Sequence, residues 1–214
     1  LAHSRMQGNR RHFCHARQPM TREVPLPGQD EADRAILHRI QEWIERAVIG
    51  LNLCPFARAP VRGNRVRLVV SHARDADSLL DDLCAELQSL AAADDDECET
   101  TLLIVADLFA DFLDFNDFLD QADAAIEVLK LDGMIQVASF HPDYRFADSA
   151  DDDVANCSNR APFPVLHLLR ESSVERAVEA LADSEDIYRR NIETLQTLGW
   201  DGWNALWSER TGKR

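Results

Sequence analysis

The sequence predicts an α/β fold: a single domain with a sheet of about four strands, largely parallel or mixed, flanked by about five helices. Four short aliphatic, β-branched runs alternate along the chain with longer segments whose apolar residues recur at helical spacing. Strands and helices that alternate in this way are typical of crossover connections, which place strands parallel. The 214 residues are 45% apolar and 29% charged, which is enough apolar material for one ordinary core.

The predicted domain covers residues 30–210 and follows a segment of opposite charge. Residues 1–29 contain five arginines and one glutamate, a local charge of +4, whereas the whole chain has a formal charge of −15. This segment shows neither helical nor strand periodicity, and it ends in the linker-like run Val24-Pro25-Leu26-Pro27-Gly28. We therefore expect residues 1–29 to be a disordered basic extension.

The first half of the domain is predicted to contain two helices and two strands. The first helix begins at Asp30 and ends at Gly50. A strand over 66–70 precedes a second helix that starts at Asp75 or Asp77, and the next strand covers 100–105. The apolar side of the second helix predicts its core residues, which are Leu79, Leu80, Leu83, Cys84, Leu87 and Leu90.

The second half continues the alternation. A helix that carries Phe115 and Leu129 ends before Gly133, and a strand over 134–140 follows. A loop over 141–163 leads to a strand over 165–170, which could join the sheet in either direction. The capping-box pattern Ser172-x-x-Glu175 predicts the start of the fourth helix. The fifth helix covers about 185–198, Gly199 ends it, and a tryptophan-rich tail follows.

Composition and missing motifs exclude several classes of protein. The acidic balance argues against a nucleic-acid-binding protein, and no apolar run approaches the ~20 residues of a membrane-spanning helix. The chain contains no glycine-rich phosphate loop and no G-x-S-x-G motif. Its five cysteines are scattered and include no C-x-x-C pair, which is most simply explained by a reduced cytoplasmic protein.

Polar residues follow the predicted strands, and the densest group begins at His141. In open α/β sheets, ligands bind beyond the carboxyl ends of the parallel strands. A histidine at such a strand end can act as a general acid or base, or it can hold a loop carbonyl in a structural role. Long loops in compact domains are usually functional or disordered, and the rings and prolines of 141–163 favour an ordered loop. We take His141 and Tyr144 as candidate catalytic residues.

The same region contains the candidate ligand-binding residues. Guanidinium groups suit carboxylates and phosphates, although the neighbouring acidic residues could pair with them instead. If the strand over 165–170 is parallel, it brings its last residues to the edge where His141 lies. His167 is placed mid-strand among leucines, where a core or network role is the leading interpretation. The candidates are Arg145, Asn159, Arg160, His167, Arg170 and Glu171.

Two further sites are considered. His141 and Asp143, with Asp152 and His72, could hold a metal ion, although no established ligand spacing occurs among them. Cys54, in a Cys-Pro pair after the first helix, could be a nucleophile with His141 as its base, or a small buried residue where the chain turns. The sequence identifies no cofactor.

Several segments together resemble an uncharacterised bacterial family, the domain of unknown function 1415 family, over about residues 33–207. The segments that carry the resemblance are Gly50 to Ala57, Phe115 to Leu119, Ala138 to Pro142, Tyr144 to Phe146, Asn159 to Pro164, Leu166 to Glu171, and Arg190 to Ile192. Where this family tends to have Ser-Pro after Asn-Arg, this chain has Ala161-Pro162. The resemblance implies a bacterial single-domain protein and supplies no activity.

Two functions follow as hypotheses. In the first, the protein is an enzyme for a small anionic metabolite, with His141 as acid, base or metal ligand and with Arg160 and Arg170 holding the anion. Tyr144 and Asn159 would orient that metabolite. In the second, the polar loop network is structural, and the protein is a non-catalytic ligand-binding or protein-interaction module.

Overall fold

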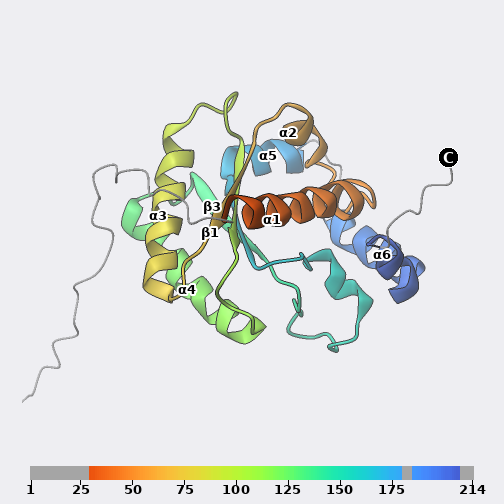
Figure 1. Ribbon diagram of the computed structural model, residues 1–214. Helices are drawn as coiled ribbons and strands as arrows, with labels where there is room; N and C mark the ends of the chain where they lie inside the picture. Colours follow the sequence, from red (N-terminus) through yellow and green to blue (C-terminus); the bar gives the residue numbers. More distant parts are fainter. Residues whose placement is uncertain (1–28, 180–184, 208–214) are drawn as a thin grey trace, which may run out of the picture.

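The computed structural model describes residues 29–179 and 185–207 (Figure 1). Helix α1 (Gln29–Trp43) begins at the first of these residues. The basic extension expected over 1–29 therefore lies, apart from Gln29, outside the described residues, as does the predicted domain end at residue 210. In the described ranges, no helix combines the length and the apolar character needed to cross a membrane.

A four-stranded mixed sheet forms the centre of the single α/β domain. Its strands are β1 (Val66–Ser71), β2 (Thr100–Val105), β3 (Ile135–Phe140) and β4 (Val165–Arg170), in the spatial order β1-β2-β4-β3. β1 and β2 pair in parallel, whereas β4 is antiparallel to both β2 and β3. The chain leaves β3 and enters β4 at the same edge without a crossover, so β4 must run in the opposite direction.

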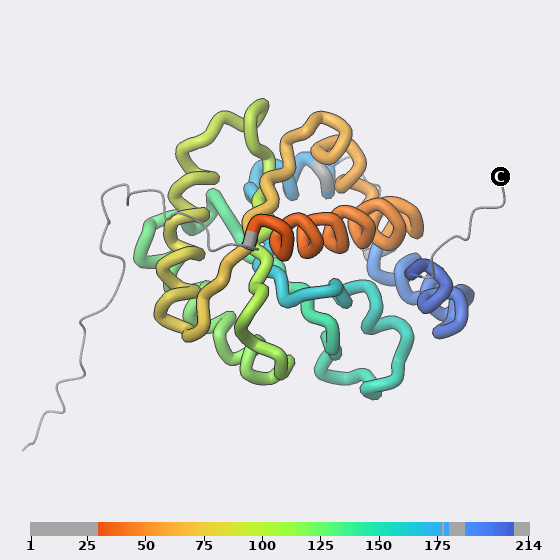
Figure 2. Tube along the Cα trace, in the orientation of Figure 1, coloured from red at the N-terminus to blue at the C-terminus, as the bar shows by residue number. Residues whose placement is uncertain are grey.

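Helices cover both faces of the sheet (Figures 1 and 2). On one face lie α3 (Ala76–Ala92) and α4 (Phe112–Leu129). On the other lie α1, its π-helical continuation η1 (Ile44–Ile49), and α6 (Glu185–Ala205). The short helices α2 (Arg58–Arg62) and α5 (Glu171–Glu179) lie together at one end of the sheet, above α1 in Figure 1.

The alternation of side chains along β2 divides the core into two clusters. All six residues of β2 are buried, because helices cover both faces of this strand. Leu103 and Val105 pack against α3 and α4, whereas Leu102 and Ile104 pack against α1. The core residues predicted for the second helix, Cys84 included, are all buried in the first cluster.

The helix ends show where local signals were sufficient. The side chain of Asp75 caps α3 by accepting the amide proton of Ser78, as one of the two predicted starts required. Gly50 ends the first helix, and a Cβ there would clash with the carbonyl oxygen of Arg46. Gly199 adopts φ 63° and ψ 178°, a non-helical conformation that ends the helix beginning at Glu185, as predicted, and a second helical segment of α6 continues to Ala205.

Three elements differ from the prediction. The five-residue α2 was not expected, and Pro60 fits it because its first turn needs no amide donor there. Helix α5 begins at Glu171, directly after β4, so Ser172 lies within the helix and does not cap it. The long loop contains the 3₁₀ helix η2 (Val154–Ser158), which is capped by the side chain of Asp153.

Candidate functional site

The carboxyl ends of β1, β2 and β3 meet at one edge of the sheet, where the 141–164 loop also lies. β4 begins at this edge and ends at the opposite one, because it is antiparallel to its neighbours. Arg170 and Glu171 are therefore placed away from His141, beside the amino ends of the other strands. The expectation that these two residues join His141 at the carboxyl edge is wrong, because it depended on a parallel fourth strand.

His141 has the surroundings of a structural histidine. Its side chain is 1% exposed, and both ring nitrogens contact the main chain. Nε2 lies 3.0 Å from the carbonyl oxygen of Phe109, and Nδ1 accepts the amide proton of Asp143 at 3.0 Å. These bonds fix a neutral ring with its proton on Nε2, and they leave neither nitrogen free to exchange protons with a substrate.

The loop arginines are held by partners within the fold. Arg160 donates from Nε to the carbonyl oxygen of Tyr144 and from Nη2 to that of Asp151, and its guanidinium lies 5.3 Å from the ring centroid of Trp200. Arg145 pairs with the Asp151 carboxylate. The arrangement ties the loop to α6, and both arginines are engaged by Asp151.

Two asparagines hold the loop in shape. Asn156 is fully buried, and its Oδ1 accepts hydrogen bonds from the Phe146 amide at 3.1 Å and the Ser149 hydroxyl at 2.6 Å. Its Nδ2 donates to the carbonyl oxygen of Ala150. Asn159 follows η2, and its carbonyl oxygen accepts the His141 amide proton.

Tyr144 lies within an aromatic group in the same loop. Its ring centroid is 5.1 Å from those of both Phe112 and Phe146. Burial raises the pKa of the Tyr144 hydroxyl, so the group stays protonated at neutral pH. These contacts assign Tyr144 a packing role beside His141.

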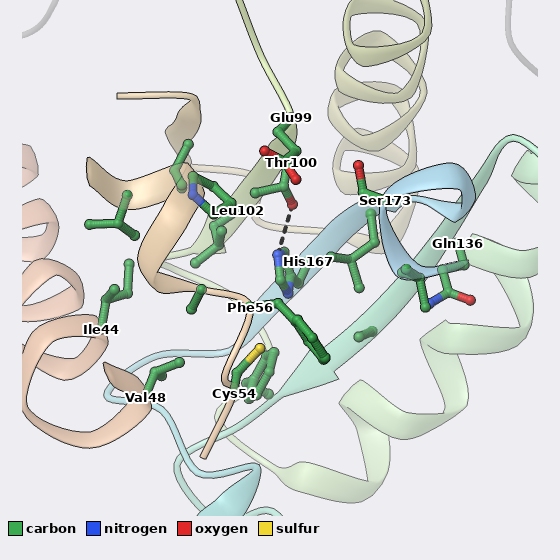
Figure 3. Close-up of a pocket in the computed structure, with 18 of the residues that line it drawn as sticks. Ile44, Val48, Cys54, Phe56, Glu99, Thr100, Leu102, Gln136, His167 and Ser173 are labelled. Carbon is green, nitrogen blue, oxygen red and sulfur yellow. Dashed lines mark hydrogen bonds between the residues drawn. The ribbon is translucent and has the colours of Figure 1, made fainter. Parts of the chain in front are cut away.

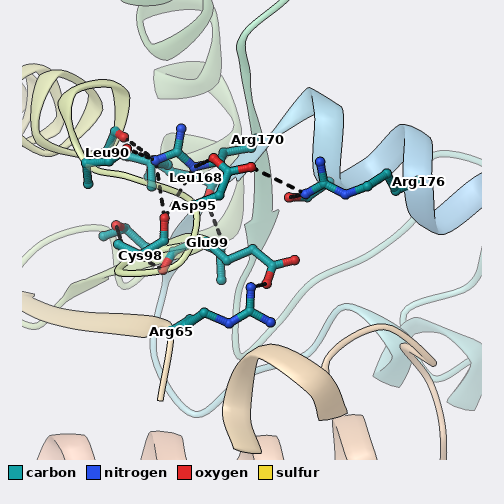
Figure 4. Close-up of polar contacts among 12 residues, drawn as sticks. Arg65, Leu90, Asp95, Cys98, Glu99, Leu168, Arg170 and Arg176 are labelled. Carbon is teal, nitrogen blue, oxygen red and sulfur yellow. Dashed lines mark hydrogen bonds and ion pairs between the residues drawn. The ribbon is translucent and has the colours of Figure 1, made fainter. Parts of the chain in front are cut away.

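Arg170 fastens the end of α3 to the sheet (Figure 4). The residue is 9% exposed, and its Nη2 donates to the carbonyl oxygens of Leu90 and Ala93. Nε and Nη2 both lie 3.2 Å from the carbonyl oxygen of Cys98, and Asp95 balances the charge with a carboxylate oxygen 3.2 Å from Nε. This guanidinium is therefore occupied by the protein itself.

Metal-ligand groups do not assemble in the described part of the chain. No three His, Cys, Asp or Glu side chains within these residues gather to hold an ion. Asp143 is exposed, and the His141 nitrogens contact main-chain groups. His72 instead bridges two carboxylates, with Nε2 2.7 Å from Asp33 and Nδ1 2.8 Å from Asp107.

A hollow of about 430 Å³ does occur at the carboxyl edge. It is lined by His141 and Asp107, together with main-chain turns and apolar side chains between them. None of the arginines proposed to bind an anion lines it. An acidic carboxylate and a neutral imidazole do not favour a carboxylate or phosphate ligand.

A second cavity, of about 320 Å³, lies on the α1 face of the sheet, toward the amino ends of β1 and β2 (Figure 3). The sheet forms one wall, η1 and the segment through α2 form another, and α5 completes the enclosure. Fifteen of its twenty lining residues are apolar. The lining consists of Trp43, Ile44, Val48, Cys54, Phe56, Ala57, Pro60, Val61, Val66, Glu99, Thr100, Leu102, Gln136, Ala138, Phe140, His167, Leu169, Ser173, Val174 and Val178.

His167 is the central polar group of this cavity. Its Nε2 lies 2.8 Å from Oγ1 of Thr100, and that hydroxyl donates to the carbonyl oxygen of Leu168 at 2.6 Å. Burial lowers the pKa of His167 to about 4, so the ring is neutral at pH 7. The ring keeps part of its accessible surface because it forms part of the cavity wall.

Cys54 also lines the cavity, and its surroundings fit the buried alternative. Burial raises the pKa of the Cys54 thiol, which lowers the fraction of nucleophilic thiolate. The nitrogens of His141 are both occupied elsewhere, so this histidine does not serve as the base of Cys54. Cys54 therefore contributes a polarisable wall.

Little in the sequence indicates this cavity. Trp43 and Phe140 belong to a predicted helix and strand, and Phe56 lies in a segment that carries the family resemblance, but apolar side chains that line a cavity look the same in a sequence as side chains that fill a core. The available signals are His167, a polar residue among leucines in a strand, and Cys54, because both candidates line the cavity.

The comparisons with known proteins give one result. The sequence profile of a family described as "Protein of unknown function (DUF1415)" matches residues 35–205. The chain belongs to this family. The match confirms the DUF1415 resemblance and includes every residue that lines the apolar cavity. No curated protein and no solved structure matches the chain.

Proposed function

We propose that this DUF1415 protein binds a small, largely apolar molecule in the cavity enclosed by the sheet, η1, α2 and α5. The observation that carries the proposal is a hollow of about 320 Å³ with a mainly apolar lining and a few convergent polar groups. Small-molecule sites typically have volumes of about 300–1,000 Å³ and this mixture of walls. This is the ligand-binding form of the non-catalytic hypothesis.

The cost of an unfilled cavity supports the proposal. Protein interiors are packed to the density of organic crystals, and a void in an apolar core lowers stability. The part of the sheet that carries Thr100 and Leu169 is covered by two short helices, whereas α1 packs closely over Ile104. A ligand in the cavity would supply the packing contacts that no side chain makes with this part of the sheet.

The lining of the cavity reaches the molecular surface. Gln136 on the edge strand β3 is exposed, and Val178 on α5 is 41% exposed, although both line the cavity. We therefore expect a ligand to enter on this side, near β3 and α5.

The alternative of an enzyme for an anionic metabolite lacks the arrangement that motivated it. Arg170 lies at the opposite edge and binds carbonyl oxygens, and Arg160, which was expected to hold the anion, donates to carbonyl oxygens of its own loop. His141 is fixed by two main-chain bonds. Tight binding of an anionic ligand in the experiments below would favour this alternative.

The proposal is tested with N-phenyl-1-naphthylamine, a neutral, largely apolar dye with one N–H group, and its fluorescence rises in apolar surroundings. We expect saturable binding of one dye per chain. Ala57→Leu fills part of the cavity and should weaken binding by at least tenfold, because Ala57 lines the wall. The matched control is Ala59→Leu, since Ala59 is exposed on the same segment and does not line the cavity. Absence of saturable binding, or equal loss in both variants, would refute the proposal.

A further inference from the structure

We infer that the ligand of the apolar cavity is a neutral molecule with a hydrogen-bond donor, of the class of phenols, alcohols or N–H heterocycles. Nδ1 of His167 accepts the hydrogen bond from this donor. This inference rests on the proposed function, because it specifies the chemistry of a ligand in the same cavity.

The hydrogen-bond chain around Thr100 fixes the tautomer of His167. The Thr100 hydroxyl has one proton, and it donates that proton to the carbonyl oxygen of Leu168 at 2.6 Å. The 2.8 Å contact between Oγ1 and Nε2 of His167 must therefore use the proton of Nε2. In a neutral ring, Nδ1 is then a bare acceptor.

This acceptor has no partner in the described part of the chain. His167 makes its hydrogen bond through Nε2, and its ring centroid lies 6.0 Å from that of Phe140. Figure 3 shows the ring in the cavity wall with its second nitrogen directed away from Thr100. An acceptor inside a protein that lacks a donor costs free energy, and a ligand O–H or N–H removes that cost.

The charges of the cavity exclude anions. The ring stays neutral because burial lowers the pKa of His167 to about 4. Among the described residues, the lining contains one carboxylate, that of Glu99, which pairs with Arg65 at 2.6 Å, and it contains no arginine or lysine. A carboxylate ligand would lose most of its hydration beside this carboxylate without gaining a cation, whereas a neutral hydroxyl gains an acceptor.

The experiment compares three naphthalene derivatives as competitors of N-phenyl-1-naphthylamine at pH 7.5. 2-Naphthol carries the donor, 2-methylnaphthalene replaces its hydroxyl with a methyl group of similar size, and 2-naphthoate carries a negative charge. We expect 2-naphthol to bind about tenfold more tightly than 2-methylnaphthalene, the value of one well-formed hydrogen bond. We expect no competition from 2-naphthoate at concentrations a hundredfold above the Kd of 2-naphthol.

Each outcome has a distinct meaning. If the dye binds but the protein has equal affinities for 2-naphthol and 2-methylnaphthalene, this inference is overturned and the proposed function stands. Tight binding of 2-naphthoate overturns it in favour of the anionic ligand. No binding of the dye or of any competitor refutes both proposals.

A variant locates the acceptor. His167→Phe removes Nδ1 and retains an aromatic ring in the cavity wall. The affinity ratio of 2-naphthol to 2-methylnaphthalene, measured by direct titration of each compound, should therefore fall to about one. If this variant does not fold, ¹⁵N NMR of the wild-type protein gives the same information, because a new hydrogen bond shifts the Nδ1 resonance of His167 when 2-naphthol binds. An unchanged preference in the variant, or an unchanged Nδ1 resonance, contradicts the assignment.

Discussion

Replacement of Arg170 with methionine is expected to lower the free energy of unfolding by about 3–5 kcal/mol, with no loss of dye binding. The guanidinium serves three carbonyl oxygens, those of Leu90, Ala93 and Cys98. An acceptor left without a donor costs about 1–3 kcal/mol when it is buried. Only the bond to Leu90 is fully buried, so the three acceptors together are expected to cost about 3–5 kcal/mol, near the lower end of the sum of their individual costs.

The measurement is urea unfolding followed by circular dichroism. The slope m, the dependence of the free energy of unfolding on urea concentration, is compared with that of the wild-type protein. The control is Arg145→Met, because Arg145 is 41% exposed and pairs with an exposed Asp151. That surface pair should contribute at most about 1 kcal/mol. A loss below about 1 kcal/mol for Arg170→Met, or equal losses for the two variants, would show that Arg170 does not fasten the end of α3.

Two further predictions concern the carboxyl edge. Hydrogen bonds to Asp107 and Asp33 raise the pKa of His72, so its contribution to stability is complete below the unfolded pKa of about 6.5 and disappears as pH rises through the folded pKa. The difference in urea midpoint between the wild-type protein and His72→Gln should therefore shrink from pH 6 to pH 9. A difference that grows would contradict the ion-pair assignment. Asn156→Ala removes the acceptor of the Phe146 amide and should lower the free energy of unfolding by about 2–3 kcal/mol. Hydrogen exchange of that amide should accelerate, and unchanged protection would refute the role of Asn156.

Local patterns were enough to predict the elements of the fold and not enough to place them all. The spacing of Leu79, Leu83 and Leu87 predicted a buried helix face, and the structure confirms it. The direction of β4 could not be predicted, because a run such as Val165 to Arg170 pairs equally well with a neighbour in either direction. That single ambiguity decides which edge of the sheet receives Arg170.

The candidate site was predicted less well, for a related reason. The partners of Arg160 and His141 are main-chain groups, which every residue possesses and no sequence pattern distinguishes. The expectation that His167 belongs to a buried network is consistent with its bond to Thr100. The hollow beside it could not be predicted, because it depends on how much of the sheet α2 and α5 leave uncovered.

The position of β4 has a consequence for synthesis on the ribosome. Within residues 29–179 and 185–207, β3 pairs only with β4, and β4 lies between β2 and β3 in the sheet. A nascent chain that has not reached Arg170 therefore has β3 without its partner and β2 with an open edge. We expect the sheet to form completely only after β4 has been synthesised, and the open strand edges to favour aggregation until then.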